Sequence, residues 1–249
     1  MKDNKKIISL FSGAGGMDIG FGMAGFQTVV AVEYDKSCCE TLKKNNPNLK
    51  VIHGDISGIK TSEILKTGGL KVTEPALVIG GPPCQSFSLA GKRMGMEDSR
   101  GKLVLEFIRV VRESLPKVFV MENVKGMVNW EKGKAIEAIM NEISDPILFE
   151  DKEYFYDVNI AVLNAADYGA PQFRERVFLV GNRMGKKFQF PEKTHSNASK
   201  GTIDLFSKKK KPYKTVWDAI GKLPPADEPS ERALRVSKTI KERIIKHGY

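Results

Sequence analysis

Short apolar runs recur along the first part of the chain, and each is followed by a polar or amphipathic stretch. The runs have the length and composition of buried strands. They predict strands at Lys5–Phe11, Thr28–Val32, Lys50–His53, Ala76–Ile79 and Lys117–Met121. Helical periodicity follows the first strand to about Ala24 and returns at Lys102–Ser114 and Lys132–Ile143. Strands that alternate with helices in this way predict an α/β fold with a mostly parallel sheet and helices on both faces.

Two later segments, Tyr154–Leu163 and Arg176–Val180, predict a hairpin that closes the sheet. From residue 191 onward, prolines and a lysine run interrupt any regular pattern, and short helices are expected only at Thr215–Lys222 and Glu231–Lys246. We therefore expect one α/β domain over residues 1–190, followed by a linker and a basic appendage over residues 191–249.

The composition narrows the class of protein. With 249 residues, 41% of them hydrophobic, the chain can bury the core of one full domain plus an appendage. No window reaches the length of a membrane-spanning helix, so we expect a cytoplasmic protein without a membrane partner. The three cysteines show neither a disulfide framework nor the paired spacing of a zinc site. The three histidines are far apart in sequence, so no metal is expected.

Positive charge is concentrated in the appendage. The formal net charge is +10, and residues 193–249 hold 14 Lys or Arg against 6 Asp or Glu, which gives +8 for that part alone. A basic surface of this kind indicates a polyanionic partner, with nucleic acid as the leading candidate. For the run Lys208–Lys211, a solvated face is an equally good interpretation.

The strand at Ala76–Ile79 leads into the turn Gly80–Ser88, which presents a single cysteine, Cys84. Two glycines allow close backbone approach, and two prolines fix the path of the chain before the thiol. A lone cysteine is more often a buried hydrophobe than a catalyst. Here its polar neighbours and its place after a parallel strand favour a nucleophile.

Three strand ends indicate a nucleoside site. The first strand runs into the glycine-rich turn Ser12–Gly20, which lacks the third glycine of the dinucleotide fingerprint because Asp18 stands there. Glu33 ends the second strand, where an acid can accept hydrogen bonds from ribose hydroxyls. Asp55 and Ile56 follow the third strand and suit the amino edge and the face of an adenine. Each acid could instead cap a helix, but the three ends together favour an adenosine cofactor without a pyrophosphate.

Further polar groups occur in the second half of the chain. Glu122 ends the strand at Lys117–Met121, and Gln172, Arg174 and Arg176 alternate along an extended segment, which predicts that they share one face. Surface ion pairs are the alternative, but three polar side chains on one side favour a planar polar ligand or a phosphate. The polar stretch from Gly91 to Gly101 is long enough to close over a site.

In this order and spacing, the motifs resemble those of the cytosine-5 DNA methyltransferases. The resemblance runs from Ile8 to Gly181 and rests on four motifs: Leu10-Phe11-Ser12-Gly13-Ala14-Gly15-Gly16, Pro83-Cys84-Gln85, Glu122-Asn123-Val124 and Gln172-x-Arg174-x-Arg176. It implies an S-adenosylmethionine-dependent methyltransferase fold with a seven-stranded sheet, and a catalytic domain over residues 1–190. The implied product of the cofactor is S-adenosylhomocysteine.

The resemblance also implies roles for single residues. Cys84 would add to carbon 6 of a flipped-out cytosine, Glu122 would hold ring nitrogen 3 and the exocyclic amine, Arg176 would bind the carbonyl oxygen, and Arg174 would support a phosphate or the thiolate. Cofactor contacts are implied for Phe11, Ser12, Gly13, Ala14, Gly16, Glu33, Tyr34, Asp55, Ile56, Gly81, Pro83 and Leu103. DNA contacts are implied for Gln85, Ser88, Lys92, Arg93, Arg100 and Gln172.

Two departures from the family pattern qualify this interpretation. Ser9 stands where the family usually has an acid. The late family motifs and a large part of the target-recognition region are absent, so the chain resembles the catalytic α subunit of a two-chain, AquI-like type II modification methyltransferase. A second, smaller subunit would then supply the missing parts, and residues 191–249 would begin the partner-binding or target-recognition region.

The expected function is methylation of duplex DNA at cytosine carbon 5, in a restriction-modification system. Three alternatives stay open. The substrate could be an RNA such as tRNA, since a related branch of the family methylates tRNA. The chain could be a catalytically silent nucleic-acid-binding paralogue, although Cys84, Glu122 and Arg176 are intact. A Cys/His hydrolase is the third alternative, and it requires a histidine beside Cys84.

Overall fold

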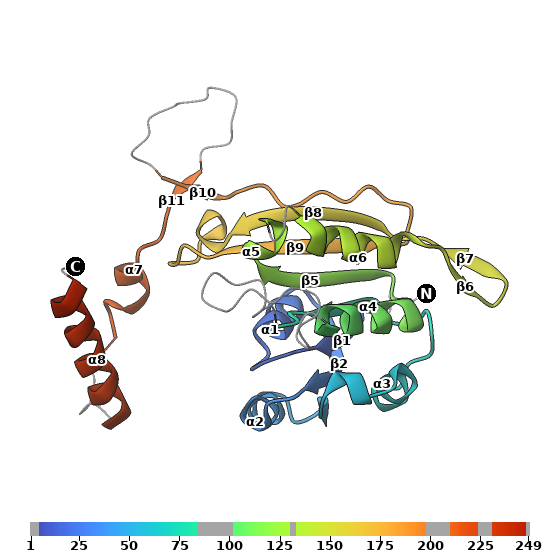
Figure 1. The fold of residues 1–249 in the computed structure, drawn as a ribbon, viewed down its shortest axis with the longest axis horizontal. Helices are drawn as coiled ribbons and strands as arrows, with labels where there is room; N and C mark the ends of the chain where they lie inside the picture. Colours follow the sequence, from blue (N-terminus) through green and yellow to red (C-terminus); the bar gives the residue numbers. More distant parts are fainter. Residues whose placement is uncertain (1–4, 84–101, 130–132, 198–209, 224–230, 248–249) are drawn as a thin grey trace.

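The computed structural model describes residues 5–83, 102–129, 133–197, 210–223 and 231–247. Its centre is a seven-stranded sheet (Figure 1). In spatial order the strands are β3 (Lys50–His53), β2 (Gln27–Glu33), β1 (Lys6–Leu10), β4 (Leu77–Gly80), β5 (Val118–Val124), β9 (Glu175–Asn182) and β8 (Asp157–Asn164). The first five pair in parallel, and β9 is antiparallel to both β5 and β8. The expected mostly parallel α/β fold is confirmed.

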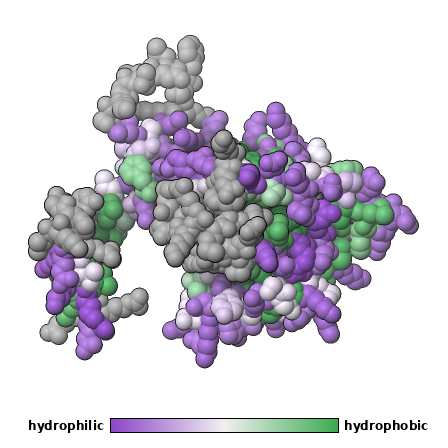
Figure 2. Space-filling model, in the orientation of Figure 1, coloured by the Kyte–Doolittle hydropathy of each residue, from purple (hydrophilic) through white to green (hydrophobic). Residues whose placement is uncertain are grey.

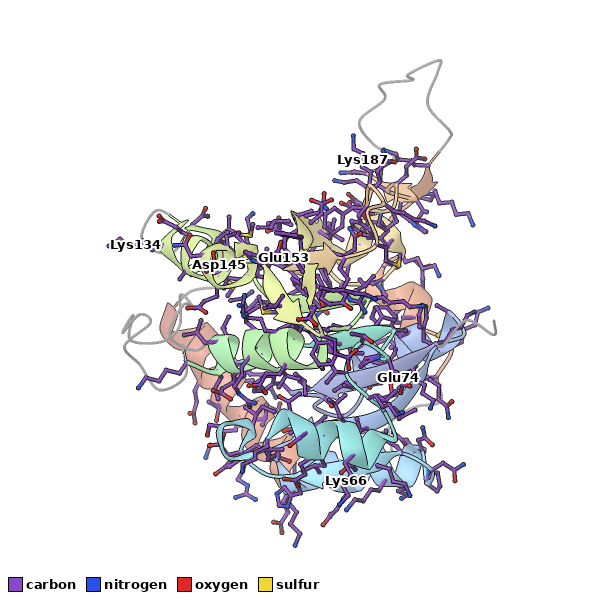
Figure 3. All side chains as sticks on the ribbon, turned by 90° about the vertical axis from the view of Figure 1, so that its right-hand side faces the viewer. Lys66, Glu74, Lys134, Asp145, Glu153 and Lys187 are labelled. Carbon is purple, nitrogen blue, oxygen red and sulfur yellow. The ribbon has the colours of Figure 1, made fainter. Side chains whose placement is uncertain are left out.

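Helices cover both faces of the sheet. Side chains alternate along each strand, so apolar residues of one strand face both sides of the sheet and pack against helices on each side. On β1, Ile8 and Leu10 face a large core that also receives Met127 of a short helix and apolar residues of three longer helices. The longer helices are α3 (Thr61–Gly68), α4 (Lys102–Ser114) and α6 (Lys134–Ser144). Ile7 of β1 points to the other face, where α1 (Gly16–Met23) contributes Met17 and Phe21. The charged residues Lys66 of α3 and Lys134 of α6 lie at the outside (Figure 3).

Among the described residues, the remaining elements are smaller. Helix α2 (Lys36–Asn45) packs Leu42 against β2, and α5 (Gly126–Asn129) follows β5. Strands β6 (Ile147–Phe149) and β7 (Lys152–Tyr154) form a separate hairpin. Strands β10 (His195–Ser196) and β11 (Lys211–Pro212) pair in parallel. Neither the α2 and α3 helices nor these two small sheets were predicted from the sequence.

The chain continues beyond the sheet as an arm that carries α7 (Val216–Ile220) and α8 (Glu231–His247). Both helices lie apart from the sheet and its covering helices (Figure 1). They occur where the sequence predicted helices, although α7 is shorter than the expected Thr215–Lys222. Within the described ranges, no helix is both long and apolar enough to cross a membrane.

A buried carboxylate holds the base of the arm to the sheet. Asp167, in the η5 turn (Ala165–Tyr168), is 5% exposed and accepts hydrogen bonds from Tyr213 Oη at 2.7 Å and Lys193 Nζ at 2.8 Å. Burial opposes ionisation of this carboxyl, but the hydrogen bonds from Lys193 and Tyr213 outweigh it and lower its pKa. The Asp167 backbone carbonyl also accepts from the Thr194 amide at 2.9 Å. Asp167 therefore joins three segments that are distant in sequence.

The end of β4 requires glycine. Gly80 pairs with Leu10 across the β1–β4 ladder, and a Cβ placed on Gly80 would run into the carbonyl oxygen of Leu10. The ring of Phe107 would be 3.1 Å from the same atom. A backbone carbonyl within a central ladder cannot move aside as a flexible side chain can. Only glycine allows β4 to lie this close to β1 at this point.

We predict that Gly80→Ala lowers the free energy of unfolding by about 2–4 kcal/mol, since the added methyl overpacks a site bordered by backbone. The matched control is Gly20→Ala in α1, where an added Cβ meets nothing within 4 Å. The control should be neutral or stabilising by up to about 1 kcal/mol, because alanine favours helix. Urea unfolding measures both, and equal stabilities of the two variants would contradict this account.

A second prediction concerns acid stability. Because the folded-state pKa of Asp167 is lowered, its stabilising contribution is present above the unfolded pKa of about 4 and is lost as pH falls through the folded value. Urea unfolding between about pH 5 and about pH 3 should therefore show a smaller pH-dependent loss of stability in Asp167→Asn than in the wild type. The exposed Asp157→Asn should keep the wild-type slope. Parallel curves for all three proteins would rule out this role of Asp167.

Candidate active site

The carboxyl ends of β1 to β4 meet at one edge of the sheet and enclose a cavity of about 400 Å³. Parallel strands bring their carboxyl ends together, which is why this edge collects residues from distant motifs. Nine of the twelve residues expected to contact the cofactor line the cavity: Phe11, Gly13, Glu33, Tyr34, Asp55, Ile56, Gly81, Pro83 and Leu103. The lining also includes Val32, Asp35 and Gly54, which sequence reasoning missed although they adjoin predicted residues.

Glu33 ties the glycine-rich turn to the end of β2. Its Oε2 accepts a hydrogen bond from the Gly13 amide at 2.7 Å, and its Oε1 accepts from the amides of Tyr34 and Asp35, both at 2.9 Å. Gly13 has a φ of +54°, a conformation that glycine adopts without strain. Both oxygens of Glu33 are thus engaged by backbone, and Oε2, which accepts a single hydrogen bond from Gly13, retains a lone pair for a hydroxyl donor in the cavity.

Asp55, which follows β3, belongs to the same lining. Its Oδ1 accepts hydrogen bonds from the Ser57 amide at 3.0 Å and the Ser57 hydroxyl at 2.8 Å, so it caps the short η1 turn (Ile56–Gly58). The bond from the Ser57 amide lowers the pKa of Asp55. An ionised carboxylate is an acceptor, and a planar amine is a donor that suits it. The flanking Ile56 and Leu103 supply apolar surface.

The other three predicted cofactor residues, Ser12, Ala14 and Gly16, do not line this cavity. Ala14 lines a separate cavity of about 300 Å³ between α1 and α2, together with Asp18 and Leu42. Ser12 Oγ donates to Ser9 Oγ at 2.9 Å, and Ser9 Oγ donates to Asp18 Oδ2 at 3.0 Å. Asp18 thereby places a carboxylate beside Ser9.

A second cavity, of about 300 Å³, lies at the ends of β5 and β9. Arg176 Nε and Glu122 Oε1 form an ion pair at 2.9 Å, and each side chain is about one quarter exposed, at 23% and 24%. In the antiparallel register, Arg176 lies opposite Val124 and Phe178 lies opposite Glu122, so the two charged residues are diagonal neighbours on one face. The walls are Leu163, Ala165, Tyr168, Arg174, Phe178 and Pro191, together with the ion pair.

The two cavities share a border at the segment that leads to the predicted nucleophile. Gly81 lines the first cavity, and a Cβ added there would lie 3.2 Å from Glu122 Oε2 in the second. Asn123, which is buried, donates from Nδ2 to the carbonyl oxygen of Pro82 at 3.2 Å and accepts from the Val124 amide at 2.8 Å. Asn123 therefore anchors Pro82 to β5, a role that sequence reasoning did not assign.

Several predicted residues cannot be placed. Cys84 and five residues with expected DNA contacts lie outside the described residues, namely Gln85, Ser88, Lys92, Arg93 and Arg100. Gln172 lies in a bend before β9, is exposed and does not line the second cavity. The extended alternation expected to align it with Arg174 and Arg176 does not reach it, because the backbone bends at this point. Of these three residues, only Arg174 and Arg176 line the second cavity.

Comparison with known proteins agrees with this arrangement. A family model described as C-5 cytosine-specific DNA methylase matches residues 5–247. The type II methyltransferase M.AquIA of Picosynechococcus sp. is 68% identical over 246 residues, covering 98% of this chain and 99% of that protein. M.SacI of Streptomyces achromogenes is 38% identical and M.FnuDI of Fusobacterium nucleatum is 46% identical. They align with 93% and 75% of this chain, which spans 61% and 50% of their own lengths.

Among solved structures, a putative DNA modification methyltransferase encoded within an E. coli prophage superposes with a TM-score of 0.68 at 30% identity. The alignment covers 89% of this chain and 56% of that one. The Dnmt2 methyltransferase of S. pombe shares the fold, with a TM-score of 0.54 at 19% identity over 74% of this chain and 51% of that one. The family match over nearly the whole sequence, the identity to M.AquIA and the ordered motifs at the two cavities show that the chain belongs to the C-5 cytosine-specific DNA methylase family.

Proposed function

We propose that this chain is the catalytic part of a type II DNA (cytosine-5) methyltransferase, which methylates a defined site in duplex DNA and protects it in a restriction-modification system. The observation that carries the proposal is the shared border of the two cavities. A nucleoside-sized cavity with ribose and amine acceptors meets a second cavity that holds a Glu122–Arg176 pair. The loop to Cys84 starts at that border.

S-adenosylmethionine fits the chemistry of the first cavity. A volume of about 400 Å³ lies within the range of small-molecule sites, about 300–1,000 Å³. Asp55 would accept a hydrogen bond from the adenine amine, and Ile56 and Leu103 would pack against the ring. Glu33 would accept from the ribose hydroxyls. The bound cofactor supplies an electrophilic methyl group. We also propose that Ser12, Ala14 and Gly16 contact the cofactor through the glycine-rich turn.

The second cavity is complementary to one edge of cytosine. The carboxyl group of Glu122 can hold ring nitrogen 3 and the exocyclic amine, while the guanidinium of Arg176 donates to the carbonyl oxygen at position 2. Arg174, on the same lining, can contact a phosphate or the thiolate. The ion pair at 2.9 Å orients both groups before a base enters. Such preorganisation lowers the cost of positioning the substrate.

The proposed reaction begins with addition of the Cys84 thiolate to carbon 6 of the cytosine. Carbon 5 is too weak a nucleophile by itself, and the addition turns the ring into an enamine while Glu122 steadies the charge at nitrogen 3. The electron pair at carbon 5 would then form the bond to the methyl group, whose bond to the cofactor sulfur breaks to leave S-adenosylhomocysteine. A base would remove the carbon-5 proton, and the bond between the Cys84 sulfur and carbon 6 would break to release Cys84. The product is 5-methylcytosine.

The target base must leave the duplex to reach these groups, at a cost of a few kcal/mol. We propose that Gln85, Ser88, Lys92, Arg93, Arg100 and Gln172 contact DNA around the vacated position. Contacts from lysine and arginine to phosphates would weaken binding as salt concentration rises. An enzyme that acts on cellular DNA in this way would work in the cytoplasm.

We further propose that a second, smaller polypeptide completes the enzyme. The chain spans 99% of M.AquIA but only 50% to 61% of M.FnuDI and M.SacI, so those proteins carry a large portion that has no counterpart here. The second polypeptide would supply most of the target-recognition region and the late family motifs. In this division, residues 1–190 form the catalytic domain, and residues 191–249 connect it to the recognition region.

Cofactor binding can be tested without catalysis. We predict that Asp55→Asn weakens S-adenosylhomocysteine binding about 5- to 10-fold, because one charge-assisted hydrogen bond is lost. Asparagine still caps the η1 turn, so the fold should be preserved. Glu40→Gln, an exposed carboxylate on α2, serves as the control and should bind as the wild type does. Isothermal titration calorimetry gives the dissociation constants, and an unchanged value for Asp55→Asn would refute the adenine assignment.

The reaction itself is tested by transfer of labelled methyl from S-adenosylmethionine to duplex DNA, with the chain alone and with extract of its source. We predict that Cys84→Ala abolishes transfer and that Glu122→Gln lowers kcat by about 10²-fold or more, while both variants bind S-adenosylhomocysteine normally. The exposed Glu153→Gln on β7 should be fully active. Label at cytosine carbon 5 in the Cys84→Ala reaction would rule out the mechanism, and label in RNA instead of DNA would change the substrate class.

A further inference from the structure

Four large apolar residues of α7 and the turn that follows it are exposed within the described part of the chain. Trp217 is 76% exposed, Leu223 66%, Val216 60% and Ile220 52%. We call these four residues the arm surface. Figure 1 shows α7 away from the sheet and its helices, and Figure 2 shows hydrophobic residues on the outside of the arm. Soluble monomers rarely leave a contiguous patch of large apolar side chains in water unless it binds something.

The arm surface is held in one shape. Thr215 and Asp218 form a capping box at the start of α7, in which the Thr215 hydroxyl accepts from the Asp218 amide at 3.1 Å and the Asp218 carboxylate accepts from the Thr215 amide at 2.7 Å. The ring of Trp217 lies against Gly221, where an added Cβ would be only 2.7 Å from the ring. A preformed patch loses little conformational entropy when it is buried.

The chemistry of the arm surface favours a polypeptide over DNA. Between Thr215 and Leu223, the only charged residues are Asp218 and Lys222, so the segment has no net charge. It therefore lacks the excess of positive charge that binding to phosphates requires. Tryptophan is among the residues most often central to protein interfaces. The following helix, α8, is basic, with six lysine or arginine residues against two glutamates, and its Leu234, Val236 and Ile240 are each at least half exposed. A partner complementary to these residues would have an apolar pocket bordered by acidic side chains.

The arm is also connected to the second cavity. Tyr213, two residues before Thr215, donates to Asp167 and packs edge-on against Phe173, with ring centroids 5.4 Å apart. Phe173 precedes Arg174, which lines the cavity with Glu122. A partner seated on α7 would therefore be held in a defined position relative to the proposed cytosine site. A recognition subunit needs such placement, because it must deliver the target base to that site.

We propose that the arm surface, with Trp217 at its centre, is the docking site for the second polypeptide of the enzyme. The inference rests on the proposed function, which requires such a polypeptide. Trp217 would insert into an apolar pocket of the partner, and α8 would face acidic side chains beside that pocket. Docking would bury apolar surface that this chain leaves in water, which supplies the driving force.

The test uses the full chain and a smaller polypeptide of the source that is purified by its binding to the immobilised wild-type chain. Methyl transfer to duplex DNA is titrated against that polypeptide. Trp217→Ala should raise its half-saturating concentration at least 10-fold, while the rate at saturation stays at the wild-type value. Leu148→Ala, at an equally exposed leucine of the β6–β7 hairpin, is the matched control and should leave both values unchanged. Ile220→Ala provides a second variant of the arm surface and should act in the same direction.

The outcomes separate this proposal from the proposed function. Wild-type titration curves for both arm variants would overturn the docking site and leave the function intact. If Trp217→Ala weakens DNA binding by the chain alone, the arm surface belongs to DNA, and if it abolishes self-association seen by light scattering, the occupant is a second copy. Calorimetric titration of the two polypeptides measures docking without catalysis. Wild-type docking that yields no methyl transfer would refute the function while supporting the surface.

Discussion

Strand β5 is the element on which both cavities depend. It pairs in parallel with β4, whose end leads through Gly81 toward the predicted nucleophile, Cys84, and antiparallel with β9, which carries Arg176. The register on the β9 side makes Glu122 and Arg176 diagonal neighbours, and a slip of one residue would turn Arg176 to the opposite face. One strand thus sets how the first cavity, the ion pair and the end of β4 lie relative to one another.

Carboxylates at two strand ends and in α1 stabilise the backbone and side chains around the glycine-rich turn and η1. Glu33 holds the glycine-rich turn through the Gly13 amide, Asp55 caps η1, and Asp18 accepts hydrogen bonds from the hydroxyls of Ser9 and Thr28. A carboxylate that accepts backbone N–H groups is fixed in orientation before any ligand binds. The acidic group hydrogen-bonded to Ser9, at the end of β1, thus comes from α1.

Helices and strands were predicted correctly from the sequence where the spacing of apolar residues was regular. Helix α4 matches the predicted Lys102–Ser114 because its apolar residues fall on one stripe, and β3 matches Lys50–His53. Helix α2 was not predicted from the sequence, because it is largely polar and buries only Cys39 and Leu42. Gln172 was expected beside Arg174 and Arg176, but the chain bends before β9, so a rule for extended backbone did not apply to it.

By itself, the sequence determined the α/β class, the acids at the strand ends and the order of motifs that indicates the family, because these depend on residues close together in the chain. Only the tertiary structure decided which distant groups meet. Asn123 reaches Pro82 across 41 positions, and Tyr213 reaches Asp167 across 46. Such contacts follow from strand order, register and the path of the arm, which no local pattern specifies. The exposure of Trp217 was decided in the same way, since an apolar residue in a helix is buried or left in water according to what packs against it.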